Sequence, residues 1–104
     1  MNKARALSRS YLRSTQGRPI KMYFDKNTAV FTATYQVDTN VPAPTDLYFN
    51  QEYFYQNGYT LELYSQESLI TDYELDDLTQ NHLYILIKDP SYLHKEVSIK
   101  LSPK

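Results

Sequence analysis

The 104-residue sequence contains no cysteine, no tryptophan and only two glycines, and these absences exclude several kinds of site. Without cysteine, the chain has neither a disulfide scaffold nor a thiolate metal site. Gly17 and Gly58 are too few for a phosphate-binding loop or a dinucleotide-binding fingerprint, which require several closely spaced glycines. The glycine–serine elbow that presents a serine nucleophile is also missing. We therefore expect no cofactor and no metal ion.

Long apolar runs are missing as well. No segment of about 18 apolar residues occurs, so we expect no transmembrane helix. The basic residues within 1–5 are not followed by an apolar segment, and they do not resemble a signal peptide. The length fits one small domain. We expect residues 1–16 to form an N-terminal linker, with 3–13 as the one segment that favours a helix, and residues 17–104 to form the domain.

The charges sum to −1 but are sorted along the chain. The segment 46–87 contains no lysine or arginine, whereas seven basic residues lie near the N-terminus: Lys3, Arg5, Arg9, Arg13, Arg18, Lys21 and Lys26. In one interpretation the two regions neutralise each other in the fold or contact a partner surface. In the other, the basic segment binds nucleic acid. We favour the first and expect no nucleic-acid partner, because the acidic region would repel phosphate.

Alternation of apolar and polar residues predicts strand after strand. The turn at 25–28 and the Asn57-Gly58 pair separate hairpin strands, and the prolines in 41–44 make a stiff connector. The predicted strands span 20–24, 29–37, 45–49, 59–64, 69–75, 83–87 and 97–101. The segment 83–87 is apolar on both faces, which is typical of a central strand. We predict an all-β fold, an antiparallel β-sandwich of about seven to eight strands that is immunoglobulin-like or carbohydrate-module-like.

Few residues are candidates for chemistry. His82 and His94 are the only histidines, and neither has the spacing of a metal ligand, so each is interpreted as an ordinary side chain rather than a base or ligand. Glu74, Asp76 and Asp77 lie in a predicted loop, which is either a solvated acidic turn or a calcium site. The spacing matches no known calcium loop, and we favour the solvated turn.

Tyrosine occurs 11 times, and aromatic residues gather around one predicted turn. Three consecutive rings at 53–55 cannot all face one core if the backbone is extended. The rings either fill the sandwich core, pack against a partner domain, or form a platform on which a sugar stacks. The candidates for an interface or a sugar-stacking site are Tyr48, Tyr53, Phe54, Tyr55 and Tyr59.

Several short motifs follow one another in a recognisable order. They are Arg9-Ser10-Tyr11, Gly17-Arg18-Pro19, Phe24-Asp25 with the strand that follows it, Ala43-Pro44-Thr45, and Tyr55 followed by Gly58-Tyr59. In this order they resemble the C-terminal β-sandwich domain of endoglycoceramidase-like family-5 glycoside hydrolases. The residues that carry the resemblance are Tyr11, Gly17, Pro19, Asp25, Pro44, Thr45 and Gly58.

The resemblance implies a parent glycosidase that hydrolyses the O-glycosyl bonds of glycolipids. In that family both catalytic glutamates belong to a (β/α)8 barrel that precedes this domain. We therefore expect no catalytic residue in this chain, which would pack on and support the barrel, in the same polypeptide or as a separate one. The alternative is a stand-alone module that binds carbohydrate or glycolipid. A parent that follows the family would be secreted or located in an endomembrane or lysosome-like compartment.

Overall fold

The computed structural model describes residues 10–52 and 55–104, and these contain nine β-strands. The strands are β1 (Tyr11–Ser14), β2 (Gly17–Asp25), β3 (Val30–Val37), β4 (Thr45–Tyr48), β5 (Tyr59–Ser65), β6 (Ser68–Ile70), β7 (Glu74–Asp76), β8 (His82–Leu86) and β9 (Glu96–Pro103). The same described residues include one 3-10 turn, η1, at Pro90–Tyr92. No helix in the described part of the chain is long and apolar enough to cross a membrane.

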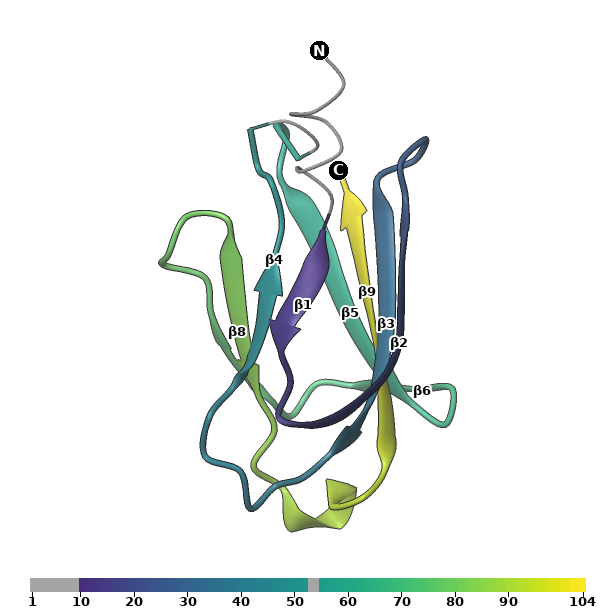
Figure 1. The fold of residues 1–104 in the computed structure, drawn as a ribbon, viewed down its shortest axis with the longest axis vertical. Helices are drawn as coiled ribbons and strands as arrows, with labels where there is room; N and C mark the ends of the chain where they lie inside the picture. Colours follow the sequence, from purple (N-terminus) through teal and green to yellow (C-terminus); the bar gives the residue numbers. More distant parts are fainter. Residues whose placement is uncertain (1–9, 53–54) are drawn as a thin grey trace.

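The strands form two antiparallel sheets that face each other. One sheet has four strands in the order β1-β4-β8-β7, and the other has five in the order β2-β3-β9-β5-β6. Figure 1 shows β1, β4 and β8 in one layer and β2, β3, β5 and β9 in the other. The prediction of an antiparallel β-sandwich is confirmed. β8 lies between β4 and β7, as its apolar sequence predicted.

Two local predictions differ from the structure. The segment 69–75 was expected to be one strand, but it divides into β6 and β7, which belong to different sheets. The helix expected within 3–13 is wrong for residues 11–13, which lie in β1, and residues 3–9 lie outside the described residues. Leu12 faces the core beside Leu47, and this long-range pairing outweighs the local helix propensity. β1 precedes the domain boundary predicted at residue 17, which stays a prediction.

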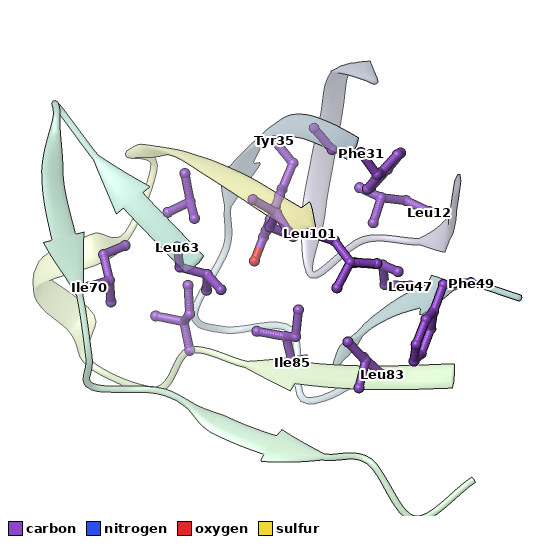
Figure 2. Packing of buried hydrophobic residues seen from close by; sticks show 14 of the residues in the cluster. Leu12, Phe31, Tyr35, Leu47, Phe49, Leu63, Ile70, Leu83, Ile85 and Leu101 are labelled. Atoms are coloured by element: carbon purple, nitrogen blue, oxygen red, sulfur yellow. The ribbon is translucent and has the colours of Figure 1, made fainter. Parts of the chain in front are cut away.

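The core lies between the sheets and follows the alternation along each strand. Figure 2 shows buried side chains reaching inward from both layers. The four-stranded sheet and its flanks contribute Leu12, Leu47, Phe49, Leu83 and Ile85, and the five-stranded sheet contributes Phe31, Tyr35, Leu63, Ile70 and Leu101. Burying each of these side chains contributes roughly 1.5–3 kcal/mol. The core therefore leaves the two outer sheet faces as the surfaces on which function can act.

Tyr55 anchors the turn region to the core through its hydroxyl. The hydroxyl donates to the carbonyl oxygen of Ala29 at 2.7 Å and lies 3.0 Å from the hydroxyl of Ser10. Burial raises the pKa of Tyr55 above its usual value, with the hydrogen bond to Ser10 acting in the opposite direction. The ring also packs edge-on against Phe49, with centroids 5.4 Å apart.

The variant Tyr55→Phe is expected to lower the free energy of unfolding by about 1–3 kcal/mol, because the buried Ala29 carbonyl loses this donor while the ring packing stays. Urea unfolding followed by circular dichroism measures the change. Tyr23→Phe is the matched control, since Tyr23 is exposed and its change should stay within about 0.5 kcal/mol. Equal losses in the two variants would contradict an anchoring role for the Tyr55 hydroxyl.

Candidate functional site

The outer face of the four-stranded sheet carries a row of rings. Tyr11 on β1, Tyr48 on β4 and His82 on β8 are direct neighbours in register. The Tyr11 and Tyr48 centroids are 5.2 Å apart, and the Tyr48 and His82 centroids are 5.7 Å apart. Tyr84 lies two residues farther along β8 and stacks parallel to His82 at 5.8 Å. We call these four residues the aromatic face.

A hydrogen-bonded pair, Asp46 and His82, lies at the centre of the aromatic face. The Nδ1 atom of His82 is 2.8 Å from an oxygen of Asp46, and the other oxygen of Asp46 is 4.0 Å from Arg13. The side chains of Asp46 and His82 are only 15% and 17% exposed, although they point outward from the sheet. The surrounding rings cover them. Asp46 therefore fixes the orientation of the imidazole within an apolar frame.

A shallow hollow adjoins the aromatic face at Tyr84. It is lined by Pro44, Glu74, Leu75, Asp76, Tyr84 and Leu86. Glu74 is paired with Lys88 at 3.0 Å, so the acidic rim is partly neutralised. Together, the rings and the hollow form an apolar surface with acidic edges. Such a surface fits a partner that offers apolar side chains and a few hydrogen-bond donors.

Comparison with known proteins assigns the family. The model of the glycoside hydrolase family 5 C-terminal domain matches residues 9–101. The chain belongs to this family. The match confirms the resemblance inferred from the motifs. No curated relative matches the sequence.

Two solved structures share the fold. Endo-glycoceramidase II from Rhodococcus sp., in its ganglioside GM3 complex, is 14% identical with a TM-score of 0.64, covering 91% of this chain and 18% of that chain. Sterylglucosidase 1 from Cryptococcus neoformans, in a structure with hit 9, is 15% identical with a TM-score of 0.69, covering 96% of this chain and 14% of that chain. The present chain therefore spans less than one fifth of the length of either solved chain.

The aromatic candidates from the sequence occupy three kinds of place. Tyr48 belongs to the aromatic face, and Tyr55 is buried in the core. Tyr59 is partly buried, packs edge-on against Phe49 at 5.2 Å, and donates to Asp77 at 3.3 Å. Its pKa is raised, first by burial and then by the charge of Asp77. Tyr53 and Phe54 lie outside the described residues. Their part in any interface stays a prediction.

The family-motif residues divide into two groups. Five shape the backbone or the core: Gly17, Pro19, Asp25, Thr45 and Gly58. For example, Asp25 closes its turn by accepting a backbone hydrogen bond from Asn27 at 2.9 Å, and Thr45 is fully buried. The other two, Tyr11 and Pro44, lie on the outer side of the four-stranded sheet. Most of the motif residues therefore serve the fold rather than a binding surface.

Sequence reasoning missed His82 and Tyr84 as surface partners. His82 was interpreted as an ordinary side chain, yet it links the rings of Tyr48 and Tyr84. The signal was the alternation of His82, Tyr84 and Leu86, which places the three on one face of β8. In the calcium alternative, Glu74, Asp76 and Asp77 would share an ion. Within residues 10–52 and 55–104, no three acidic or histidine side chains are arranged to hold a metal.

Proposed function

We propose that this family-5 domain packs on and supports a (β/α)8 catalytic barrel, and that the barrel contacts the aromatic face. The barrel would belong to the same polypeptide or to a separate one. We further propose that the parent is a glycosidase acting on glycolipids, since the structural relatives are named as an endo-glycoceramidase and a sterylglucosidase. The domain itself would carry no catalytic residue.

The observation that carries this proposal is the contrast between the two outer faces. On the four-stranded sheet, four rings lie in contact around the shielded hydrogen bond between Asp46 and His82. On the five-stranded sheet, the corresponding outward positions of the central strands β3 and β9 are Thr32, Thr34, Ser98 and Lys100. Tyrosine is enriched in interfaces because it offers a large apolar surface and a hydroxyl group. The four-stranded face is therefore the better candidate for a domain interface.

The position of β1 supports the same face. β1 is an edge strand of the four-stranded sheet, and its first residue, Tyr11, belongs to the aromatic face. In the family arrangement the barrel precedes this domain, and the family match begins at residue 9. A preceding barrel would therefore connect to the sandwich directly beside Tyr11.

The double variant Tyr48→Ser with Tyr84→Ser tests the interface. With the barrel of the parent protein supplied as a separate chain, its affinity for this domain is expected to fall at least about tenfold, because interface tyrosines are frequent hot spots. Titration calorimetry measures the affinity. The melting temperature of the mixture shows whether the domain stabilises the barrel. The matched control is Tyr23→Ser with Tyr64→Ser, which removes two rings near the other sheet face.

Two results would contradict the proposal. One is an equal loss of barrel affinity in the control pair, which would move the interface away from the aromatic face. The other is saturable binding of a glycan by the isolated domain that is abolished by Tyr48→Ser. The second result would instead support the alternative function of a carbohydrate- or glycolipid-binding module.

A further inference from the structure

The outer face of the five-stranded sheet carries a hollow of about 430 Å³. Side chains in two neighbouring cross-strand rows line it. The first row comprises Lys21, Thr34, Ser98 and Tyr64, and the second comprises Tyr23, Thr32 and Lys100. Ala33 and Ile99, which lie between the rows, are buried in the core, so the alternation places both rows on the outward face. We call this site the hydroxyl hollow.

The floor of the hydroxyl hollow consists of short polar side chains on the two central strands. The hydroxyl groups of Thr34 on β3 and Ser98 on β9 lie 3.0 Å apart, and Thr32 adds a third hydroxyl. Thr34 is only 8% exposed although it faces outward, because longer side chains rise around it. A hydroxyl group can both donate and accept a hydrogen bond. The floor therefore suits a ligand whose own polar groups do both.

Two tyrosine rings stand at opposite corners of the hydroxyl hollow. Tyr23 lies on the edge strand β2, and Tyr64 lies on β5, with β3 and β9 between them. Adjacent strands are about 4.8 Å apart, so the backbones of β2 and β5 are separated by about 14 Å. A hydrogen bond to the Glu62 carboxylate raises the pKa of Tyr64, and it restrains the ring. This separation fits a chain of several small rings better than one compact molecule.

The charges on the strands of this sheet are balanced. The basic residues Arg18, Lys21 and Lys100 are matched by the acidic residues Asp25, Glu62 and Glu96. A balanced surface gives no net attraction to a strongly charged ligand. The ammonium groups of Lys21 and Lys100 can still donate hydrogen bonds to neutral oxygen atoms. The charge pattern therefore favours an uncharged ligand.

The backbone beneath the hydroxyl hollow offers nothing to a peptide. β3 pairs with β2 and β9, and β9 pairs with β3 and β5, so the ladder already uses their backbone groups. A peptide that binds by adding a strand needs a free sheet edge. Recognition at this site therefore depends on side chains alone.

We propose that the hydroxyl hollow binds a neutral oligosaccharide. The apolar C–H faces of its sugar rings lie against Tyr23 and Tyr64, and its hydroxyl groups exchange hydrogen bonds with the floor. The volume lies within the range of small-molecule sites. Of the sequence candidates for sugar stacking, Tyr48, Tyr55 and Tyr59 do not line this hollow. The site does not depend on the proposed contact with a barrel, which uses the other sheet.

Titration of the 104-residue chain with cellotetraose and with lacto-N-neotetraose, both neutral, tests the proposal. Saturable binding of at least one is expected, with amide shifts in the NMR spectrum at 32–34 and 98–100 and little change as salt is raised. Tyr23→Ser is expected to weaken binding about tenfold through lost ring contact. Tyr23→Phe keeps the ring and should stay within about twofold. Thr34→Val removes a floor hydroxyl and is expected to weaken binding about fivefold.

The matched control is Tyr48→Ser, which removes a ring from the other sheet and should leave the affinity for the tetrasaccharide unchanged. Thermal unfolding checks that each variant is folded. The proposal would be overturned if neither tetrasaccharide bound saturably, if the losses in Tyr48→Ser and Tyr23→Ser were equal, or if the amide shifts lay away from the hollow. Self-association of the free chain that is lost in Tyr23→Ser would also overturn it, by identifying a second copy as the occupant. Absence of glycan binding would leave the affinity for a barrel untouched, so the two proposals can fail separately.

Discussion

Replacement of Gly17 by alanine is expected to cost at least about 3 kcal/mol of stability, a large share of what a domain of this size possesses. Gly17 has a φ of +131°, a conformation that side-chain-bearing residues rarely adopt. A Cβ atom at this position would lie 2.0 Å from the carbonyl oxygen of Gln36 and 2.9 Å from the amide nitrogen of Asp38. Both are backbone atoms of the neighbouring strand or its end. The chain can relieve the clash only by separating β2 from β3.

Gly58 provides the matched control for this prediction. It also has a positive φ, +100°, but a Cβ atom there would meet only the flexible side chain of Lys104, at 3.4 Å. The variant Gly58→Ala should therefore show the backbone strain alone, about 1 kcal/mol. Urea unfolding of both variants measures the difference, and soluble yield gives a second readout for Gly17→Ala. Similar losses in the two variants would show that the contact with β3 is not what requires glycine at position 17.

The strands that were predicted well are those whose sequence alternates and whose neighbours are regular. In β3 and β9 the sequence alternates, and the buried apolar residues fall where the alternation places them. β1 was missed because a short, charge-flanked segment carries only one core residue, Leu12. The division between β6 and β7 was missed because the irregular pattern in 69–75 records a crossing from one sheet to the other. In both cases the pairing partner decides the structure, and it lies far along the chain.

The aromatic face could be predicted only in part for the same reason. Tyr48 was identified from a local cluster of rings, and Tyr11 was identified as a motif residue. That these two residues touch, and that His82 continues the row, depends on the register between three strands distant in sequence. Composition indicates that rings are plentiful but not which of them meet. The register is fixed by the core residues on the inner face, such as Leu47 and Leu83.

A buried glutamine, Gln16, joins the two sheets at the point where the hydrogen bonding between β4 and β8 ends. Gln16 is only 1% exposed, although glutamine is usually a surface residue. Its side-chain nitrogen donates to the carbonyls of Ile87 at 2.7 Å and Val41 at 3.3 Å, and its side-chain oxygen accepts from the amide of Ile87 at 2.9 Å. Pro44 has no N–H group with which to extend the pairing of β4 beyond Thr45. The Gln16 amide therefore takes the place of a neighbouring strand for Ile87.

The variant Gln16→Ala is expected to lower the free energy of unfolding by about 3–5 kcal/mol. It leaves the amide and the carbonyl of Ile87 without their partner and opens a cavity between the sheets, and each buried unsatisfied group costs roughly 1–3 kcal/mol. Urea unfolding measures the loss. Gln56→Ala is the control, because the Gln56 side chain bonds to the Glu52 carbonyl in an exposed position and its change should stay within about 0.5 kcal/mol. A loss below about 1 kcal/mol for Gln16→Ala would mean that water replaces the amide, and that the connection between the sheets rests on apolar packing alone.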